Sequence, residues 1–468
     1  MSQPSSAALI SARIDRLPAS GFLWSWLARV SFGAFFEIYE IALTTVMGPA
    51  LVAAGNFHKG AGGLLGLPDQ ASFAFATFAG LFVGAMAFSS AADRWGRRPI
   101  FTFSLVGYAL ATIVMGLQGG AVSICLWRFI ASIAIGTEVV AIDSYLSELT
   151  PKRMRGRGFA FSKFIQYLAI PVVGVLSVLV VHHGFMGVAG WRVLAFAPVI
   201  GALAIWVIRR GLPESPRWLA EHGRTAEAER IVGELEAKTV AGTGRALPEP
   251  EVPTAPPEGP SGFVALWAPG MRSRIVMISL ASSAGTIAYF GFGGWLPSLL
   301  EAQGVTITKS LQFTAATSLA QPLAPLLFLL FADRIERKWQ IIIGGLLSGA
   351  FGLLFVRQTT ALGWIGCGVA ITCANNLLSG AMHTYRSELF PTRIRGRAIG
   401  FVYAIDRLVA AFNSYLVGFI LMTFRVPGVF AFLAGALLVC SLTVGLFGPR
   451  TKGLAAEEIG GDPVPVPG

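Results

Sequence analysis

Charged residues are scarce in this chain. They make up 13% of its 468 residues, whereas soluble domains typically carry about 25%, and hydrophobic residues make up 54%. This composition excludes an ordinary soluble globular protein. Long windows without charge instead predict a polytopic membrane protein, in which the backbone polar groups are satisfied inside helices.

Cysteine is also scarce, and its placement argues against several kinds of site. Cys125, Cys367, Cys373 and Cys440 all lie inside apolar runs without metal-site spacing or extracellular pairing, so we expect packing residues and neither a metal nor a cofactor. The phosphate-binding pattern G-x-x-x-x-G-K-[ST] does not occur, which argues against an ATP-driven pump. No Ser/His or Asp/Asp catalytic arrangement is recognisable either, so an enzyme is disfavoured. A non-transporting membrane receptor is the other class considered.

The net charge of +11 favours membrane topology over nucleic-acid binding. The basic residues lie in short loops between apolar runs, where positive charge sets the orientation of a membrane protein. Residues 1–21 lack the basic-then-apolar order of a cleavable signal peptide, so the first span is expected to stay. We therefore expect the lipid bilayer as the surrounding phase and no nucleic-acid partner.

Apolar runs predict twelve membrane-spanning helices, each long enough to cross a hydrocarbon core of ~30 Å. The predicted spans are 22–54, 70–92, 99–119, 121–149, 158–182, 190–209, 272–302, 310–332, 339–357, 361–389, 398–423 and 427–448. They predict a first six-helix bundle at 1–209, a cytoplasmic connector at 210–271, a second bundle at 272–449 and a cytoplasmic tail at 450–468. Within the connector, an amphipathic helix is expected from Thr225, and Pro248–Pro260 and the tail are expected to be flexible.

The loops after even-numbered spans are rich in Lys and Arg, and the opposite loops carry few. Because basic residues mark the cytoplasmic side, both termini are predicted to be cytoplasmic in a plasma (inner) membrane.

Two motifs occur twice at one spacing. Tyr-Leu-Ser-Glu-Leu-Thr-Pro at 145–151 reappears as Tyr-Arg-Ser-Glu-Leu-Phe-Pro at 385–391, at an offset of 388 − 148 = 240 between the glutamates. Ala-Asp-Arg at 92–94 reappears at 332–334, with the same offset of 333 − 93 = 240. The common offset indicates that the chain is an internal duplication.

These motifs resemble those of the major facilitator superfamily. Asp93-Arg-Trp-Gly-Arg-Arg98 is similar to its signature loop. The Glu-x6-Arg spacings, Pro-Glu-Ser-Pro-Arg at 213–217 and Thr-Lys-Gly at 451–453 are similar to the branch that contains sugar porters, organic-ion transporters and metabolite:proton symporters. The resemblance implies an all-α membrane protein of two six-helix bundles that works as a monomer by proton-coupled symport. Three positions depart from the family motifs: Ser89 and Glu336 stand where a glycine is expected, and Arg450 stands where an acid is usual before Thr-Lys-Gly.

The seventh span favours an organic anion over a sugar. Within this span no glutamine precedes Gln303, whereas similar sugar porters carry glutamine-rich motifs there. The pattern Phe-Gly-x-x-x-Trp-Leu-Pro at 290–297 resembles that of organic-acid and organic-ion members. Glu37-Ile-Tyr-Glu40 is similar to the first-span pattern of metabolite:proton symporters. We expect a monocarboxylate or aromatic acid; a sugar or polyol is the alternative, and an organic cation or drug comes third.

Ionisable residues inside spans are the proton-coupling candidates, because an unpaired charge at mid-membrane is costly, at least ~2.5–3.5 kcal/mol. The candidates are Glu37, Glu40, Glu138 and Asp143. The alternative is that some of them pair permanently with Arg128 or Arg407 to hold helices together. Asp143 has the second alternative of a place in the cytoplasmic gate.

Arg407 is the strongest candidate for holding an anionic group, because its planar guanidinium matches a carboxylate. Asp406 points about 100° away from it around the helix and is the candidate for a cationic substrate instead. Arg128 is expected near the outer mouth, and His383 and Arg386 near the gate or the lipid headgroups. Further candidate contacts, with interhelical hydrogen bonding as the alternative role, are Tyr289, Asn375, Asn376, Gln166 and Gln321.

The repeated loop motifs predict a cytoplasmic gate. Acids and arginines at equal offsets in the two halves are suited to tie the halves together and favour an outward-open state. The alternative is that the arginines only follow the positive-inside rule. The predicted gate residues are Asp93, Arg94, Arg97, Arg98, Glu148, Arg155, Asp333, Arg334, Glu388 and Arg395.

Overall fold

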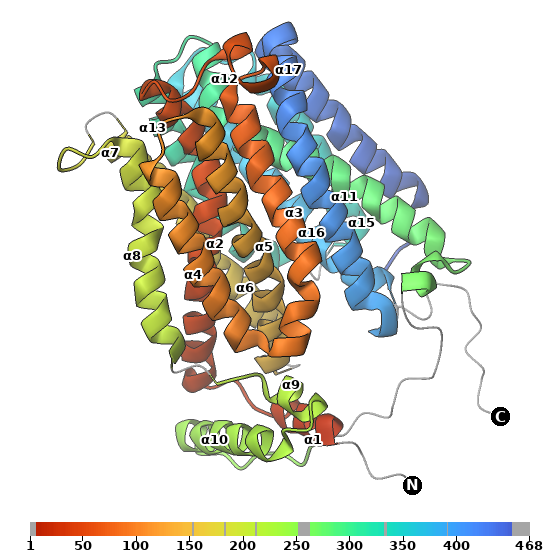
Figure 1. The fold of residues 1–468 in the computed structure, drawn as a ribbon. Helices are drawn as coiled ribbons and strands as arrows, with labels where there is room; N and C mark the ends of the chain where they lie inside the picture. The colour runs from red at the N-terminus through yellow and green to blue at the C-terminus, as the bar shows by residue number, and fades with distance from the viewer. Residues whose placement is uncertain are drawn as a thin grey trace.

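The computed structural model describes residues 6–151, 154–181, 184–210, 213–250, 263–331, 335–390 and 392–451. These residues form a bundle of long helices, with three shorter helices, α1, α9 and α10, lying across one end of it (Figure 1). We call this end the connector end and the opposite end, which carries α12, the far end. The all-α architecture agrees with the prediction.

The first half contains α2 to α8. Their bounds are α2 Gly21–Ala53, α3 Asp69–Trp95, α4 Arg97–Leu117, α5 Ala121–Leu149, α6 Arg155–Tyr167, α7 Ala169–Val180 and α8 Gly190–Arg210. Two 3-10 turns, Gly60–Gly62 and Leu64–Gly66, lie between α2 and α3. The predicted fifth span is broken at Leu168 into α6 and α7, three residues before Pro171, which has no amide hydrogen for the helical ladder.

The second half contains α11 to α17. Their bounds are α11 Met271–Gly293, α12 Leu296–Ala302, α13 Ile307–Ser318, α14 Ala320–Phe331, α15 Arg337–Phe355, α16 Ala361–Leu389 and α17 Thr392–Phe447. The last two predicted spans both lie in α17, which turns at Arg425, a residue with a φ of 56° shortly before Pro427. In the described part of the chain, nine helices are long and apolar enough to cross a membrane, counting α17 once.

The connector folds onto the first half. Its helices are α9 Pro216–Glu221 and α10 Thr225–Thr243, and a 3-10 turn at Phe263–Trp267 precedes α11. Together with α1 Ser6–Asp15, α9 and α10 share a core with the ends of α2 and α5, in which Ile14 and Ile231 are buried with Trp26. The helix expected from Thr225 is confirmed, whereas most of the stretch expected to be flexible, and the tail beyond Thr451, lie outside the described residues.

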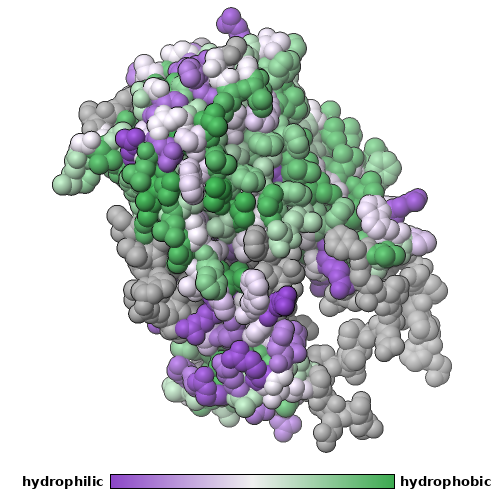
Figure 2. All heavy atoms as spheres, viewed as in Figure 1, coloured by the Kyte–Doolittle hydropathy of each residue, from purple (hydrophilic) through white to green (hydrophobic). Residues whose placement is uncertain are grey.

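The surface agrees with a membrane-embedded bundle. Figure 2 shows hydrophobic side chains along the flanks of the bundle and hydrophilic ones over the helices at the connector end. The two halves meet where α3 packs against α17, α6 against α14 and α7 against α13. Within the first half, α3 and α5 approach closely because Gly84 and Gly136 lack side chains: a Cβ on either would come within 2.3 Å of a carbonyl oxygen of the other helix.

Candidate functional site

A fully buried ion pair joins α2 to α5. Arg128 donates through Nη1 to Glu40 Oε2 at 2.7 Å, and neither side chain is exposed. Its Nε donates to Thr77 Oγ1 at 2.9 Å and its Nη2 to Thr44 Oγ1 at 3.1 Å. Phe73 lies under the guanidinium, 5.3 Å from its carbon to the ring centroid. The pairing of a first-span acid with Arg128, one of the alternatives that the sequence left open, is thus present in the structure.

Two other acids among the first-half candidates have described side chains. Glu37 in α2 and Glu138 in α5 are both buried. Asp143 lies in α5, but its side chain is outside the described set. The structure thus brings one of the four candidates, Glu40, onto Arg128.

A second buried ion pair lies in the other half and was not predicted. Asp406 in α17 accepts from Arg386 Nη2 of α16 at 2.9 Å, and both its oxygens accept from Ser282 Oγ of α11, at 2.8 and 2.6 Å. Arg386 is buried on this carboxylate, so its expected place at the headgroups is wrong. His383, one helical turn before it, is exposed and bonds through Nδ1 to the Tyr403 hydroxyl at 2.6 Å.

Arg407 sits among uncharged polar and aromatic groups. Its guanidinium carbon lies 5.9 Å from the Phe290 ring centroid of α11. Among the residues that the structure describes, no carboxylate forms an ion pair with it. Tyr289 interacts with Arg407, Gln321 and, from the first half, Tyr167. Arg407 therefore lies beside a polar cluster to which both halves contribute.

Three further predicted contacts have partners within their own half. Asn376 Nδ2 donates to Gln321 Oε1 at 2.9 Å, which extends the cluster around Tyr289. Asn375 Oδ1 accepts from Ser348 Oγ at 2.8 Å, so it links α16 to α15. Gln166 bonds to Ser162 at 2.9 Å and accepts from Lys163 at 3.0 Å.

Tyr167 is the member of the cluster that the sequence analysis missed. The duplication carries the signal for it, because 407 − 240 = 167 places Tyr167 at the position equivalent to Arg407. In the same way 406 − 240 = 166 pairs Gln166 with Asp406. The two halves thus carry a neutral pair and a charged pair at equivalent positions.

The gate motifs form ion pairs inside each half. Arg97 Nη2 donates to Glu148 Oε1 at 2.8 Å in the first half, and Arg337 Nε lies 3.4 Å from Glu388 Oε1 in the second. Both pairs join residues of one half, so a tie between the halves at this end stays a prediction.

The remaining predicted gate residues fall into three groups. Arg94 and Arg98 are exposed at the ends of α3 and α4, and Arg395 Nε donates to the Phe390 carbonyl at 3.2 Å. The side chains of Asp93 and Arg155 are outside the described set, and Asp333 and Arg334 lie outside the described residues altogether.

Glu214 of the connector closes the start of α4. Its two oxygens accept from the backbone amides of Arg97 at 3.0 Å and Arg98 at 3.1 Å, which are otherwise unpaired donors at a helix N-terminus. Gly96 makes room for it: its φ is 99°, and a Cβ there would come within 2.5 Å of Glu214 Oε2. The connector is thereby fixed to the signature loop.

The doubled tyrosines play equivalent parts. Tyr145 OH donates to the Pro213 carbonyl at 2.6 Å, and Tyr385 OH donates to the Pro449 carbonyl at 2.8 Å. Each anchors the segment that follows the last span of its half. The repeat therefore holds the connector end together, and the buried charges lie elsewhere.

Direct polar contacts cross between the halves at the far end. Lys59 Nζ donates to Glu301 Oε2 at 2.8 Å, and Ser298 Oγ donates to Gln70 Oε1. Tyr415 OH also donates to Ser72 Oγ at 3.4 Å. These contacts hold the two halves together at the end opposite the connector.

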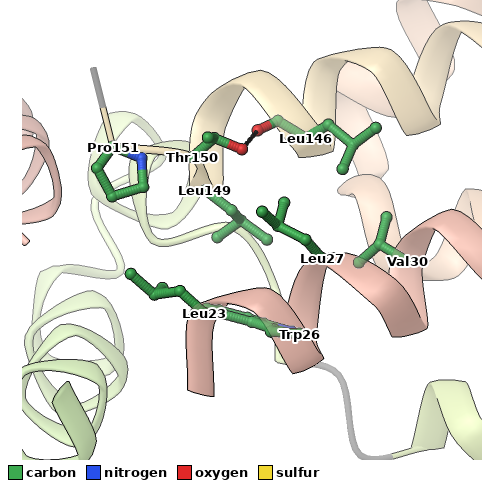
Figure 3. A pocket seen from close by; sticks show the side chains of 8 residues that line it. All are labelled: Leu23, Trp26, Leu27, Val30, Leu146, Leu149, Thr150 and Pro151. Carbon is green, nitrogen blue, oxygen red and sulfur yellow. Dashed lines mark hydrogen bonds between the residues drawn. The ribbon is translucent and has the colours of Figure 1, made fainter. Parts of the chain in front are cut away.

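A small apolar pocket lies between α2 and α5 at the connector end (Figure 3). Leu23, Leu27 and Leu149 line it, and the Thr150 hydroxyl is turned to the Leu146 carbonyl at 2.6 Å. Because no ionisable side chain lines it, this pocket has no part in the charge chemistry.

Comparison with known proteins places the chain among membrane transporters. The family described as "Sugar (and other) transporter" matches residues 27–462. A putative metabolite transport protein of Bacillus subtilis (strain 168) is 28% identical over 446 residues, covering 94% of this chain and 95% of the relative. The niacin transporter of Acinetobacter baylyi is 25% identical over 452 residues, covering 96% and 99%. The crystal structure of a D-xylose-proton symporter has the same fold, with a TM-score of 0.72 at 18% identity and coverages of 93% and 100%.

Proposed function

Because the chain belongs to the sugar (and other) transporter family of the major facilitator superfamily, we propose that it moves a small organic anion together with protons by alternating access. The substrate we infer is a monocarboxylate or an aromatic acid. The observation that carries this inference is Arg407, a cation with no carboxylate partner in the described part of the chain, beside polar groups from both halves.

The geometry around Arg407 suits a carboxylate. A guanidinium offers two parallel donors to a planar acid, and a charge-assisted hydrogen bond is stronger than a neutral one. Phe290 and Tyr289 supply aromatic surface beside it, which favours an acid with a ring. The related niacin transporter is named for an aromatic monocarboxylate, which supports the same substrate class.

Proton coupling is assigned to Glu40 with Arg128. A buried carboxylate is neutral when it is protonated, and it requires a cationic partner when it is ionised. The protonation of Glu40 therefore decides whether its ion pair with Arg128 joins α2 to α5. Binding or release of that proton changes the packing of the first half. Such a charge change biases a two-state equilibrium between conformations.

The two ends of the bundle are assigned from the positive-inside rule. The connector end carries the repeated basic motifs and is placed in the cytoplasm, and the far end faces outward. The contacts of Lys59 with Glu301 and of Gln70 with Ser298 then close the outward side. In the alternating-access cycle they must break when the substrate enters from outside.

The experiment is uptake into proteoliposomes with an imposed pH gradient. When the outside is acidic, labelled nicotinate and benzoate should accumulate against their concentration gradient faster than in protein-free vesicles, which the neutral acids enter unaided. Vesicles without a pH gradient should only equilibrate. Labelled xylose serves as the sugar comparison. Accumulation of xylose without either acid would overturn the organic-anion assignment.

A sugar or polyol remains the second candidate because of one observation. Tyr289, Gln321 and Asn376 form a neutral polar cluster that is able to hydrogen-bond hydroxyl groups. The same uptake assay separates the two functions, since Arg407→Ala should weaken acid transport and spare sugar transport.

A further inference from the structure

The second half holds an acid site of its own, built on three helices. Asp406 of α17 is 5% exposed and receives the Arg386 guanidinium from α16 and the Ser282 hydroxyl from α11. Its partner Arg386 is 7% exposed. A buried carboxylate with one cation and one hydroxyl is held in its ionised form by a small number of replaceable contacts.

This site is independent of Glu40 and Arg128. The 240-residue offset of the repeated motifs would place the equivalent of Arg128 at Gly368 and the equivalent of Asp406 at Gln166. Neither of those residues carries a charge. The two ion pairs are therefore separate features of the two halves, and each is free to have its own role.

An exposed titratable group lies next to the buried pair. The Arg386 guanidinium carbon lies 4.9 Å from the centroid of the Tyr403 ring, and the Tyr403 hydroxyl is 2.6 Å from Nδ1 of His383. His383 is exposed. Movement of Tyr403 would therefore open Arg386 and the carboxylate behind it to protons from the surface.

Positive charges outnumber negative charges around Asp406. The groups that face it are Ser282 from α11, Arg386 from α16, Arg407 from its own helix and Cys440 from the last part of α17. On the other side of α17, the described contacts from α3 are made by the uncharged Ser72 and Phe75. Ionised Asp406 cancels one of the two nearby guanidinium charges, and protonated Asp406 cancels neither.

We propose that Asp406 is a second proton-binding carboxylate of the transport cycle, whose protonation frees Arg386 and strengthens the attraction of the Arg407 region for an anion. The proton is taken up on an Asp406 oxygen, while both arginines keep their own protons. Substrate and proton then favour each other's binding. Protonation of Asp406 leaves uncancelled positive charge, and the bound anion offsets that charge. The link to the anion rests on the proposed function; the proton site itself does not.

The test of the site uses infrared spectroscopy of the purified full-length protein in liposomes at a series of pH values, without substrate. A protonated carboxyl gives a C=O band that an ionised one lacks. Because other carboxyls of the chain also protonate, the readout is the difference between spectra. A component of the band that appears on acidification in wild type and in Glu40→Gln should be missing in Asp406→Asn and return at a changed frequency in Asp406→Glu. Identical spectra for wild type and Asp406→Asn would overturn the proposal and leave the pair with a structural role.

A milder variant covers the case in which Asp406→Asn does not fold. Ser282→Ala removes the hydroxyl that donates to the ionised carboxylate and leaves Asp406 in place. The C=O band should then persist to higher pH, because the charged form has lost a donor. A band whose pH range does not move would contradict the assignment to Asp406.

Transport then tests the coupling. In proteoliposomes that accumulate nicotinate, Asp406→Asn should move one proton fewer per substrate than wild type, measured from the membrane potential at which net uptake stops. An unchanged ratio would overturn the coupling role. If no acid is transported at all, the organic-anion function fails, and the infrared result still decides the proton site.

Discussion

Arg128 reaches from α5 to Glu40 of α2, with 2.7 Å between Nη1 and Oε2 and no exposure of either side chain. Thr77 and Thr44 accept the guanidinium's other donors. Burying two charges is tolerated only when they are paired and hydrogen-bonded, and here every nitrogen of the guanidinium donates at least one hydrogen bond. The relationship therefore couples the ionisation of one acid to the packing of two helices.

Removing one partner of this pair should destabilise the protein more than removing both. Arg128→Ala leaves a buried carboxylate without its cation, and we expect a loss of about 3–5 kcal/mol. The double variant Glu40→Gln with Arg128→Gln should recover a large part of it. Thermal unfolding in detergent measures both, and equal losses for the single and double variants would show that the pair is not the source of the effect.

Glu40→Gln should separate transport from coupling. Glutamine keeps the size and cannot take up or release the proton, so accumulation driven by a pH gradient should be lost while exchange of labelled for unlabelled substrate continues. Glu138→Gln in α5 is the matched control for loss of a buried acid in the same half. Normal gradient-driven accumulation by Glu40→Gln would remove Glu40 as the coupling residue.

Arg407→Ala should raise KM for the acid substrate by about 10- to 100-fold, the effect of losing a charge-assisted hydrogen bond of about 1.5–3 kcal/mol. Arg407→Lys should recover part of the affinity, since it restores the charge without the planar fork. Arg357→Ala, at an exposed position after α15, is the control that should leave KM unchanged. Uptake kinetics that are the same for all three variants and wild type would refute the substrate role.

Gly96→Ala should destabilise the connector end by more than 1 kcal/mol, roughly the cost of forcing a side chain into a positive-φ conformation. It also pushes Glu214 away from the amides that start α4. Gly233→Ala is the control, because it lies within α10 with open space around it and should be neutral or stabilising. Equal melting temperatures for the two variants would contradict this account of Gly96.

The docking of α1 on α10 should weaken in acid. Burial works to raise the pKa of Glu236, but hydrogen bonds from Arg13 and Arg16 outweigh it and hold that pKa below its ordinary value of 4.5. A lowered pKa means that the stabilisation is complete above the ordinary value and is lost as the pH falls through the folded one. The protection of the α1 amides against hydrogen exchange, relative to the intrinsic rate at each pH, should therefore fall only in the acid range.

Substitution at the same position tests this origin. Glu236→Gln should give α1 at neutral pH the low protection against exchange that wild type shows in acid. Glu234→Gln, which removes an exposed acid paired with Arg230 on the same helix, is the control and should leave α1 protected. Fast exchange in both variants would point to general loosening of α10 instead.

Much of the fold was readable from the residues. The apolar runs located the spans closely; 121–149 and 361–389 coincide with α5 and α16. The breaks at Leu168 and Leu319 were not predicted, because they interrupt helices through local backbone geometry inside runs that are uniformly apolar or nearly so. The turn at Arg425 falls between the predicted spans 398–423 and 427–448. Hydropathy reports how long a run is and is insensitive to where its helix bends.

The sequence by itself determined the membrane class, the duplication and the short list of buried charges, since each follows from composition and spacing along one chain. It also picked out Arg407 as the cation without an adjacent partner. Only the tertiary structure decided which charges meet: Glu40 with Arg128, and Asp406 with Arg386. Pairing between residues 88 or 20 positions apart depends on how helices pack and rotate against one another, and no local pattern encodes that.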